Sequence, residues 1–183
     1  MIQIRKNIFE TNSSSSHALC VLKEDKYIEG MVDPGWHVND GRMRFYDDEL
    51  TFGRAPFQIL TDWWGRLCFT IASYANDLAM REAIEELCYS RIEGLERIEY
   101  PKDEWYGFGK NSTEDKYYYG SIDHQSAGML QGFLRTNHIS LEDFIFNNRY
   151  LVIIDGDEYN VFDTVMSLPT WNKDAVEEIY YNA

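Results

Sequence analysis

The chain has 183 residues, and a chain of this length buries about 70% of its unfolded surface on folding, so it needs neither disulfides nor a metal to hold one domain together. Its 17 basic and 31 acidic residues give a net charge of −14. This charge disfavours direct binding of nucleic acid, because proteins that do so carry a basic surface. Aromatic residues make up 15% of the chain, which excludes a disordered acidic tail.

Several features of the sequence predict a cytoplasmic protein. No apolar stretch reaches the roughly 18 residues that a membrane-spanning helix needs. Residues 1–6 lack the apolar run of a signal peptide. Cys20, Cys68 and Cys88 are odd in number and form no CxxC pair, so we expect reduced thiols. We expect no cofactor and no metal, because the histidines and cysteines show no spacing typical of metal ligands.

The first part of the chain predicts short strands and then a long apolar helix. Strands are expected over 2–9, 17–23 and 42–46. A helix is expected from Pro56, which is favourable in a first helical turn, to about residue 75. Apolar residues recur in it at helical spacing and also fall outside that stripe, which predicts a central helix. The residues on the stripe are Leu60, Trp64, Leu67, Cys68, Ile71 and Ala75, and those outside it are Trp63 and Phe69.

Three further helices are expected before the next strand. The second helix, over about 77–92, has an apolar face with Ile84 and an opposite face with Glu82, Glu85 and Glu86. The third spans about 126–137, with Ser126 as its N-cap. The fourth is short and begins at Ser140, and acidic residues follow in its first turn, where the helix dipole favours them.

The last part of the chain predicts a hairpin and a final helix. Residues 150–154 form an apolar strand, 155–158 a turn and 159–162 a return strand. A helix is expected over about 172–181. Helices and strands mix without a βαβ rhythm, and no linker divides the chain. The sequence therefore predicts a single α+β domain over 1–183, with a central apolar helix packed on a small, mainly antiparallel sheet.

The most unusual stretch runs from Arg5 to His17 and reads RKNIFETNSSSSH. It resembles the opening of a group of phage and prophage proteins that share an Arg-x-Asn-x-Phe-Glu-Thr-Asn-Ser-Ser-Ser-x-His start. The resemblance is confined to these residues, and it implies an origin in a mobile element. Small, acidic, single-domain phage proteins are often inhibitors of host defence systems, and the anti-CRISPR proteins are the best-known group. The resemblance therefore implies a protein of this kind, acting in the cytoplasm of a host bacterium.

The distribution of acidic residues leads to the main functional hypothesis. Ordered carboxylates can imitate phosphates and dock into a basic nucleic-acid channel, aided by electrostatic steering. The protein would then bind a bacterial defence nuclease or its guide complex, an RNA-guided nuclease above all, and block nucleic-acid binding or cleavage. The alternative is that the charge only keeps the protein in solution. The candidate partner-binding residues are Glu82, Glu85, Glu86, Glu93, Glu96, Asp155, Asp157 and Glu158.

A second hypothesis is a small enzyme that binds a phosphate or nucleotide. Serine hydroxyls and backbone N–H groups in a tight loop can hold a phosphate, with a basic side chain beside it and a histidine as acid or base. The alternative is a serine-rich turn whose hydroxyls bond to their own backbone. The candidate phosphate-binding residues are Arg5, Asn12, Ser13, Ser14, Ser15 and Ser16. The candidate catalytic residues are His17, Asp123 and His124.

Five tryptophans and many tyrosines give a third alternative. Tryptophan and tyrosine are enriched at interaction hot spots, so an aromatic face could make the protein a homodimer. We expect Trp63 and Trp64 in the core, and Trp105 and Tyr106 at the surface.

Overall fold

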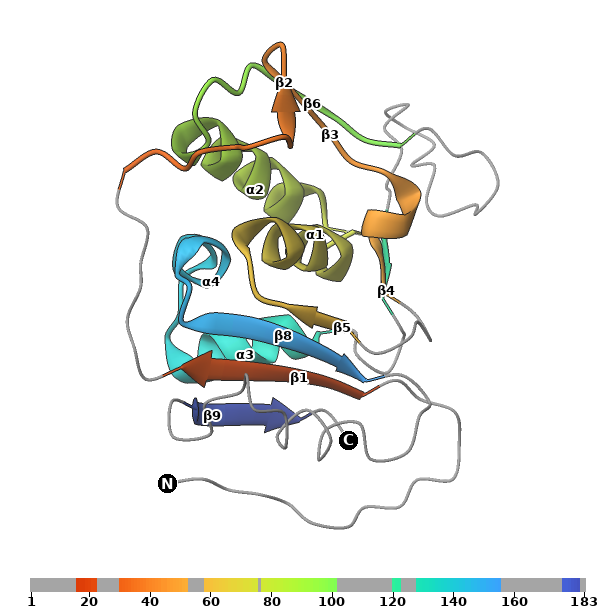
Figure 1. Cartoon of the computed structure of the whole chain (residues 1–183). Coiled ribbons are helices and arrows are strands. Elements are labelled where there is room, and N and C mark those ends of the chain that lie inside the picture. The colour runs from red at the N-terminus through yellow and green to blue at the C-terminus, as the bar shows by residue number, and fades with distance from the viewer. Residues whose placement is uncertain are drawn as a thin grey trace.

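The computed structural model describes residues 16–22, 30–52, 58–75, 77–101, 120–122, 128–155 and 176–181. These residues form a mixed α/β body with four α-helices and small, mostly antiparallel sheets (Figure 1). The first half contains β1 (Ser16–Leu22), β2 (Val38–Asn39), β3 (Arg42–Arg44), the 3₁₀ helix η1 (Asp47–Glu49), β4 (Thr51–Phe52), β5 (Gln58–Leu60), α1 (Trp63–Ser73) and α2 (Leu78–Arg91). The second half contains β6 (Arg97–Glu99), β7 (Ser121–Ile122), α3 (Met129–Asn137), α4 (Leu141–Phe146), β8 (Tyr150–Asp155) and β9 (Val176–Tyr181).

The largest sheet has the strand order β5-β8-β1-β9, and every neighbouring pair in it is antiparallel. Ser16 lies opposite Asp155 at one end of the β1–β8 ladder, and Val21 lies opposite Tyr150 at the other. The side chains of residues 150–154 are all buried, as expected for a central strand whose two faces are covered. The strands predicted over 17–23 and 150–154 are confirmed where the structure describes them, and the strand predicted over 2–9 lies outside the described residues.

The predicted hairpin after β8 is wrong in its pairing. β1 and β5 occupy both edges of β8 at Val152–Ile154, so no return strand can pair with those residues. The predicted return strand, 159–162, lies outside the described residues. The strand is favoured by three β-branched residues, Val152, Ile153 and Ile154, but these residues do not specify which strands lie beside it. Here both neighbouring strands come from distant parts of the chain.

The predicted C-terminal helix is also wrong over the residues that the structure describes. Residues 176–181 form β9, which is antiparallel to β1 and places Ala18 opposite Tyr181. The segment VEEIYY combines β-branched and aromatic residues that fit a strand. Its glutamates are helix formers, but pairing along the second edge of β1 outweighs that weak local preference.

Helix α1 lies between the main sheet and α2, as the arrangement in Figure 1 shows. Its buried residues are Trp64, Arg66, Leu67, Cys68, Phe69, Thr70, Ile71 and Ala72. The prediction of a central helix that is apolar nearly all round is confirmed. Trp64 belongs to the core and Trp63 packs against it, as predicted.

The predicted start of this helix is wrong. Residues 58–60 form strand β5, and the helix begins at Trp63 instead of near Pro56. Asp62 is the N-cap, and its Oδ1 accepts a 2.7 Å hydrogen bond from the Gly65 N–H. An aspartate that satisfies a free N–H of the first turn is a stronger start signal than a proline further upstream. Leu60 therefore belongs to the strand, where it lies opposite Val152.

The other three helices follow the sequence prediction closely. α2 matches the helix predicted over 77–92, and α4 has the predicted Ser140 cap, whose Oγ accepts a 3.0 Å bond from the Asp143 N–H. The cap predicted for α3 is wrong, because Gly128, with φ 83°, holds the N-cap position. Ser126 itself lies outside the described residues. No helix in the described part of the chain is long and apolar enough to cross a membrane.

Two small sheets complete the fold. β2, β3 and β6 form one of them, antiparallel between β2 and β3 and parallel between β3 and β6. Met43 is buried while Arg42 and Arg44 are exposed. The strand predicted over 42–46 is confirmed for residues 42–44 and ends there. β4 and β7 form a parallel pair beside α1.

The position of Gly120, just before β7, requires a glycine because of both its backbone angle and its close neighbours. Its φ is 121°, and a Cβ there would lie 3.1 Å from the Ala72 Cα and 3.4 Å from the Leu50 carbonyl oxygen. We expect Gly120→Ala to lower the free energy of unfolding by about 1–3 kcal/mol in urea denaturation. Gly94→Ala is the control, because Gly94 has φ 69° with open space around it. Equal losses for the two variants would contradict the role of the close approach.

Candidate functional site

The exposed side of α2 and the turn after it carry most of the predicted partner-binding carboxylates. Glu82 and Glu86 lie one turn apart on α2, about 6 Å along the helix axis, and both are exposed. Glu93 and Glu96 follow the helix and are also exposed. We call these four residues the acidic surface of α2. Glu85 is only partly exposed, and it accepts a 3.2 Å bond from the Arg81 Nε, so it is less available to a partner.

The beginning and the inner side of α2 are well anchored. Asp77 caps the helix, and its Oδ1 accepts a 3.1 Å bond from the Met80 N–H. Ile84 and Cys88 are buried in the core. The opposite face therefore presents its carboxylates from a fixed scaffold.

The end of α2 is held by backbone and side-chain contacts. The Val32 N–H donates to the Arg91 carbonyl at 2.6 Å, and the Glu93 N–H donates to the Val32 carbonyl at 3.0 Å. The buried Arg91 side chain donates to the Gly30 carbonyl at 3.0 Å and forms an ion pair with Glu142. A rigid arrangement loses less conformational freedom when a partner binds, which favours affinity.

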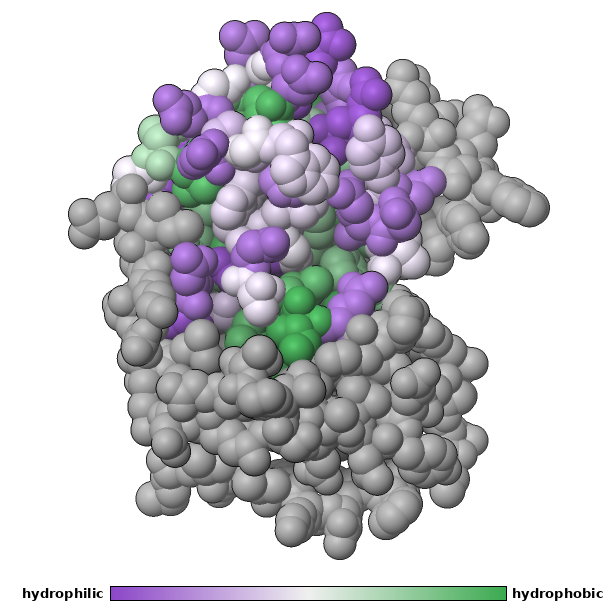
Figure 2. Space-filling model, in the orientation of Figure 1, coloured by the Kyte–Doolittle hydropathy of each residue, from purple (hydrophilic) through white to green (hydrophobic). Residues whose placement is uncertain are grey.

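Not every acidic side chain near this end of the molecule is available. Figure 2 shows hydrophilic residues gathered over β2, β3 and β6. There Glu99 is held between two arginines, 2.7 Å from the Arg44 Nη2 and 2.5 Å from the Arg97 Nη2. The hydrogen bond from Arg44 lowers the pKa of Glu99 below its ordinary value, with Arg97 adding to the effect. This sheet therefore contributes mixed charge rather than a continuation of the acidic surface.

Of the remaining predicted site residues, the structure describes only Ser16, His17 and Asp155. Ser16 and His17 begin β1, and Asp155 ends β8 directly opposite Ser16. The residues Arg5, Asn12, Ser13, Ser14, Ser15, Asp123, His124, Asp157 and Glu158 lie outside the described residues, as do Trp105 and Tyr106. The phosphate site of the serine loop and the partner-binding role of Asp155, Asp157 and Glu158 remain predictions.

Two cysteines in the described part of the chain are buried free thiols. Burial raises the pKa of Cys68, and it raises the pKa of Cys88 to about 12. Thiols with raised pKa values are protonated at neutral pH and make poor nucleophiles. Within the described ranges, no group of three or more His, Cys, Asp or Glu side chains is placed to hold a metal ion.

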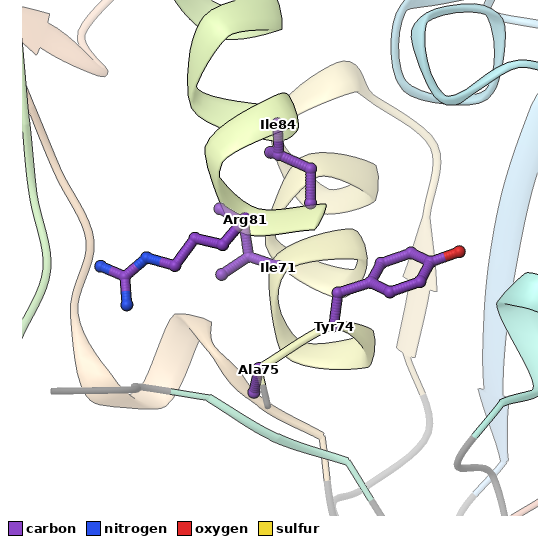
Figure 3. A pocket seen from close by; sticks show the side chains of 5 residues that line it. All are labelled: Ile71, Tyr74, Ala75, Arg81 and Ile84. Carbon is purple, nitrogen blue, oxygen red and sulfur yellow. The ribbon is translucent and has the colours of Figure 1, made fainter. Parts of the chain in front are cut away.

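A small pocket lies between α1 and α2 (Figure 3). Ile71, Tyr74 and Ala75 line it from one side, and Arg81 and Ile84 from the other. Its volume of about 10 Å³ leaves room for about one water molecule. The Arg81 guanidinium and the Tyr74 hydroxyl extend away from it to opposite sides, so no polar group is aimed into the pocket. It is too small for a substrate.

The structure also reveals a stack of rings that the sequence analysis missed. His37 lies between Trp36 and Trp64, with centroid distances of 3.9 and 4.0 Å. Trp64 in turn stacks on Phe45 at 4.8 Å, and Phe45 on Tyr100 at 5.4 Å. The stack runs from the surface into the core, since Trp36 is 77% exposed and Phe45 only 1%. The neighbouring pairs Trp36–His37 and Trp63–Trp64 are visible in the sequence, but nothing there shows that they meet.

The position of His37 predicts that acid weakens the fold. Partial burial lowers the pKa of His37, and the nearby Asp62 and Glu49 only partly oppose this shift. The unfolded chain, with a pKa of about 6.5 at this residue, therefore takes up a proton first as the pH falls. The stability linked to His37 is complete above pH 6.5 and is lost as the pH falls from there to the lowered pKa of the folded state.

Urea unfolding at pH 7.5, 6.5 and 5.5 measures this effect. We expect the free energy of unfolding to decrease over this series in the natural protein, and to decrease less in His37→Phe, which keeps a ring in the stack. The same pH dependence in both proteins would assign it to other groups.

No family model matches this chain, and the searches of curated proteins and of solved structures give no match either.

Proposed function

We propose that this protein is a phage-encoded acidic inhibitor that binds a bacterial nucleic-acid-handling defence complex in the host cytoplasm. An RNA-guided nuclease is the target that we favour, which would make the protein an inhibitor of the anti-CRISPR type. The observation that carries this proposal is the acidic surface of α2, whose carboxylates are exposed on a well-anchored helix and on the turn after it. The net charge of −14 and the phage-like stretch over 5–17 support it.

The mechanism follows from the chemistry of nucleic-acid channels. Such channels are lined with lysine and arginine, which neutralise phosphates. Carboxylates at fixed positions can occupy the same places and exclude the nucleic acid. Opposite charges on the two proteins raise the rate of association at low salt, and added salt reduces this effect. The inhibitor then acts by occupancy and needs no chemical step.

A titration distinguishes occupancy from turnover. A purified RNA-guided nuclease at a fixed concentration is incubated with increasing amounts of the protein, and cleavage of target DNA is measured. The proposal predicts that inhibition becomes complete near one inhibitor per nuclease. Complete inhibition at far lower ratios would contradict it and would favour the alternative of an enzyme that uses the serine loop of residues 12–16. In that case, replacing the four serines and His17 by alanine, with the fold checked, would abolish the inhibition.

A further inference from the structure

A tight turn presents Trp36 at the surface. The Gly35 N–H donates to the Asp33 Oδ1 at 2.9 Å, and the His37 N–H donates to the Pro34 carbonyl at 3.1 Å. Gly35 has φ 56°, a conformation that glycine adopts without strain. These bonds fix the backbone on both sides of Trp36. The large side chain is thus held in place although it is 77% exposed.

The ring stack supports one face of the Trp36 indole. Its neighbour His37 is itself stacked on the buried Trp64 and lies edge-on to Trp63 at 5.5 Å. Within the described residues, His37 is the one ring that contacts Trp36. With so much of the side chain exposed, the other face of the indole is open to solvent. An exposed, pre-positioned tryptophan is typical of an interaction hot spot, because little freedom remains to be lost on binding.

Carboxylates in this turn and near His37 favour a positively charged ligand. Asp33 belongs to the turn and is exposed, as is Asp62 at the start of α1. Asp62 and Glu49 both act electrostatically on His37, the residue stacked on Trp36. A cation above an indole face is attracted by the ring and by such carboxylates. The phosphates of a nucleic acid would be repelled, so stacking of a nucleobase is disfavoured here.

We propose that the Trp36 turn binds an arginine side chain of a basic protein surface. The guanidinium would lie flat on the open face of the indole, and the negative charges of Asp33 and Asp62 would add attraction at longer range. Arginine fits better than lysine, because its planar group stacks on aromatic rings and is more weakly hydrated. This inference rests on the proposed function for the biological partner, and it adds a second contact surface that is separate in the sequence from the acidic surface of α2.

Binding of a tetra-arginine peptide tests the inference without any nuclease. The indole N–H resonances are followed by NMR in ¹⁵N-labelled protein, and Trp36→Phe assigns the resonance of Trp36. We expect tetra-arginine to shift this resonance and tetra-citrulline, its uncharged counterpart, to leave it unchanged. The double variant Asp33→Asn/Asp62→Asn should bind about two- to tenfold more weakly, because asparagine can still accept from the Gly35 and Gly65 N–H groups but lacks the charge.

Several outcomes would overturn the inference. These are equal shifts with tetra-citrulline, unaltered affinity in the double variant, or a stronger shift with an oligothymidine. A shift of the Trp36 resonance with protein concentration alone would show a second copy of the chain as its occupant instead.

Nuclease inhibition by Trp36→Ala is measured separately, with Tyr46→Ala as a control at another exposed aromatic residue. If the protein inhibits the nuclease but tetra-arginine does not bind at Trp36, the inference is rejected and the proposed function stands.

Discussion

Arg66→Met is expected to lower the free energy of unfolding by roughly 3–5 kcal/mol, because it removes the donors for several buried carbonyl groups. Arg66 is fully buried in α1. Its Nε donates to the Ile145 carbonyl at 2.9 Å, and its Nη1 donates to the carbonyls of Thr61 at 2.6 Å and Tyr150 at 2.9 Å. These acceptors belong to α4, to the segment before α1 and to β8. One side chain therefore joins three parts of the fold.

The charge of Arg66 survives its burial. Burial lowers the pKa of the guanidinium to about 10, with Asp62 opposing the shift, so the group stays protonated at pH 7. Urea denaturation of Arg66→Met and of Arg97→Met measures the effect. Arg97 is the control, since its side chain is exposed in β6 and water screens its ion pair with Glu99, so its replacement should change stability little. A loss below about 1 kcal/mol for Arg66→Met would contradict its role in joining these elements.

Reversing charges on the acidic surface of α2 is expected to have the largest effect on binding. Glu86→Lys/Glu93→Lys should weaken binding to the target nuclease by about 10- to 100-fold, because each change replaces attraction to a basic channel by repulsion. The loss should be greatest at low salt and should shrink as salt screens the charges. The affinity of purified protein for the guide-loaded nuclease, measured at several salt concentrations, tests this.

The control for this experiment is a variant with the same net charge. Asp47→Lys/Asp48→Lys changes two acidic residues of η1, and both double variants have a net charge of −10. If binding depends on the position of the carboxylates, the η1 variant should lose much less affinity than the α2 variant. Equal losses would show that only total charge matters, and the assignment of the α2 surface would then fail.

The helices could be predicted from the sequence because their signals are local. Ser140 caps α4, and Ile84 and Cys88 mark the buried side of α2, so each signal lies in or directly beside the helix that it predicts. The start of α1 differs from the prediction because the Asp62 cap is a stronger start signal than Pro56. Gly128 at the start of α3 was missed because its left-handed conformation is not visible in the sequence.

The strand partners and the ring stack could not be predicted in this way. β8 is flanked by strands that begin at Ser16 and Gln58, and the pairing of such distant segments has no local signal. The same holds for Trp36, which meets Trp64 through His37. Of the candidate site, the exposed glutamates of α2 followed from helical periodicity, whereas the pairing of Glu85 with Arg81 and of Glu99 with two arginines emerged only from the structure.

Affinity capture tests the central proposal most directly. Tagged protein is mixed with a bacterial lysate that contains an RNA-guided nuclease, with and without enzymes that degrade DNA and RNA, and the retained proteins are eluted with increasing salt. We expect the nuclease complex to be retained after the nucleic acids are degraded and to be released as the salt concentration rises. Failure to retain it, or retention that requires intact nucleic acid, would contradict a direct acidic inhibitor.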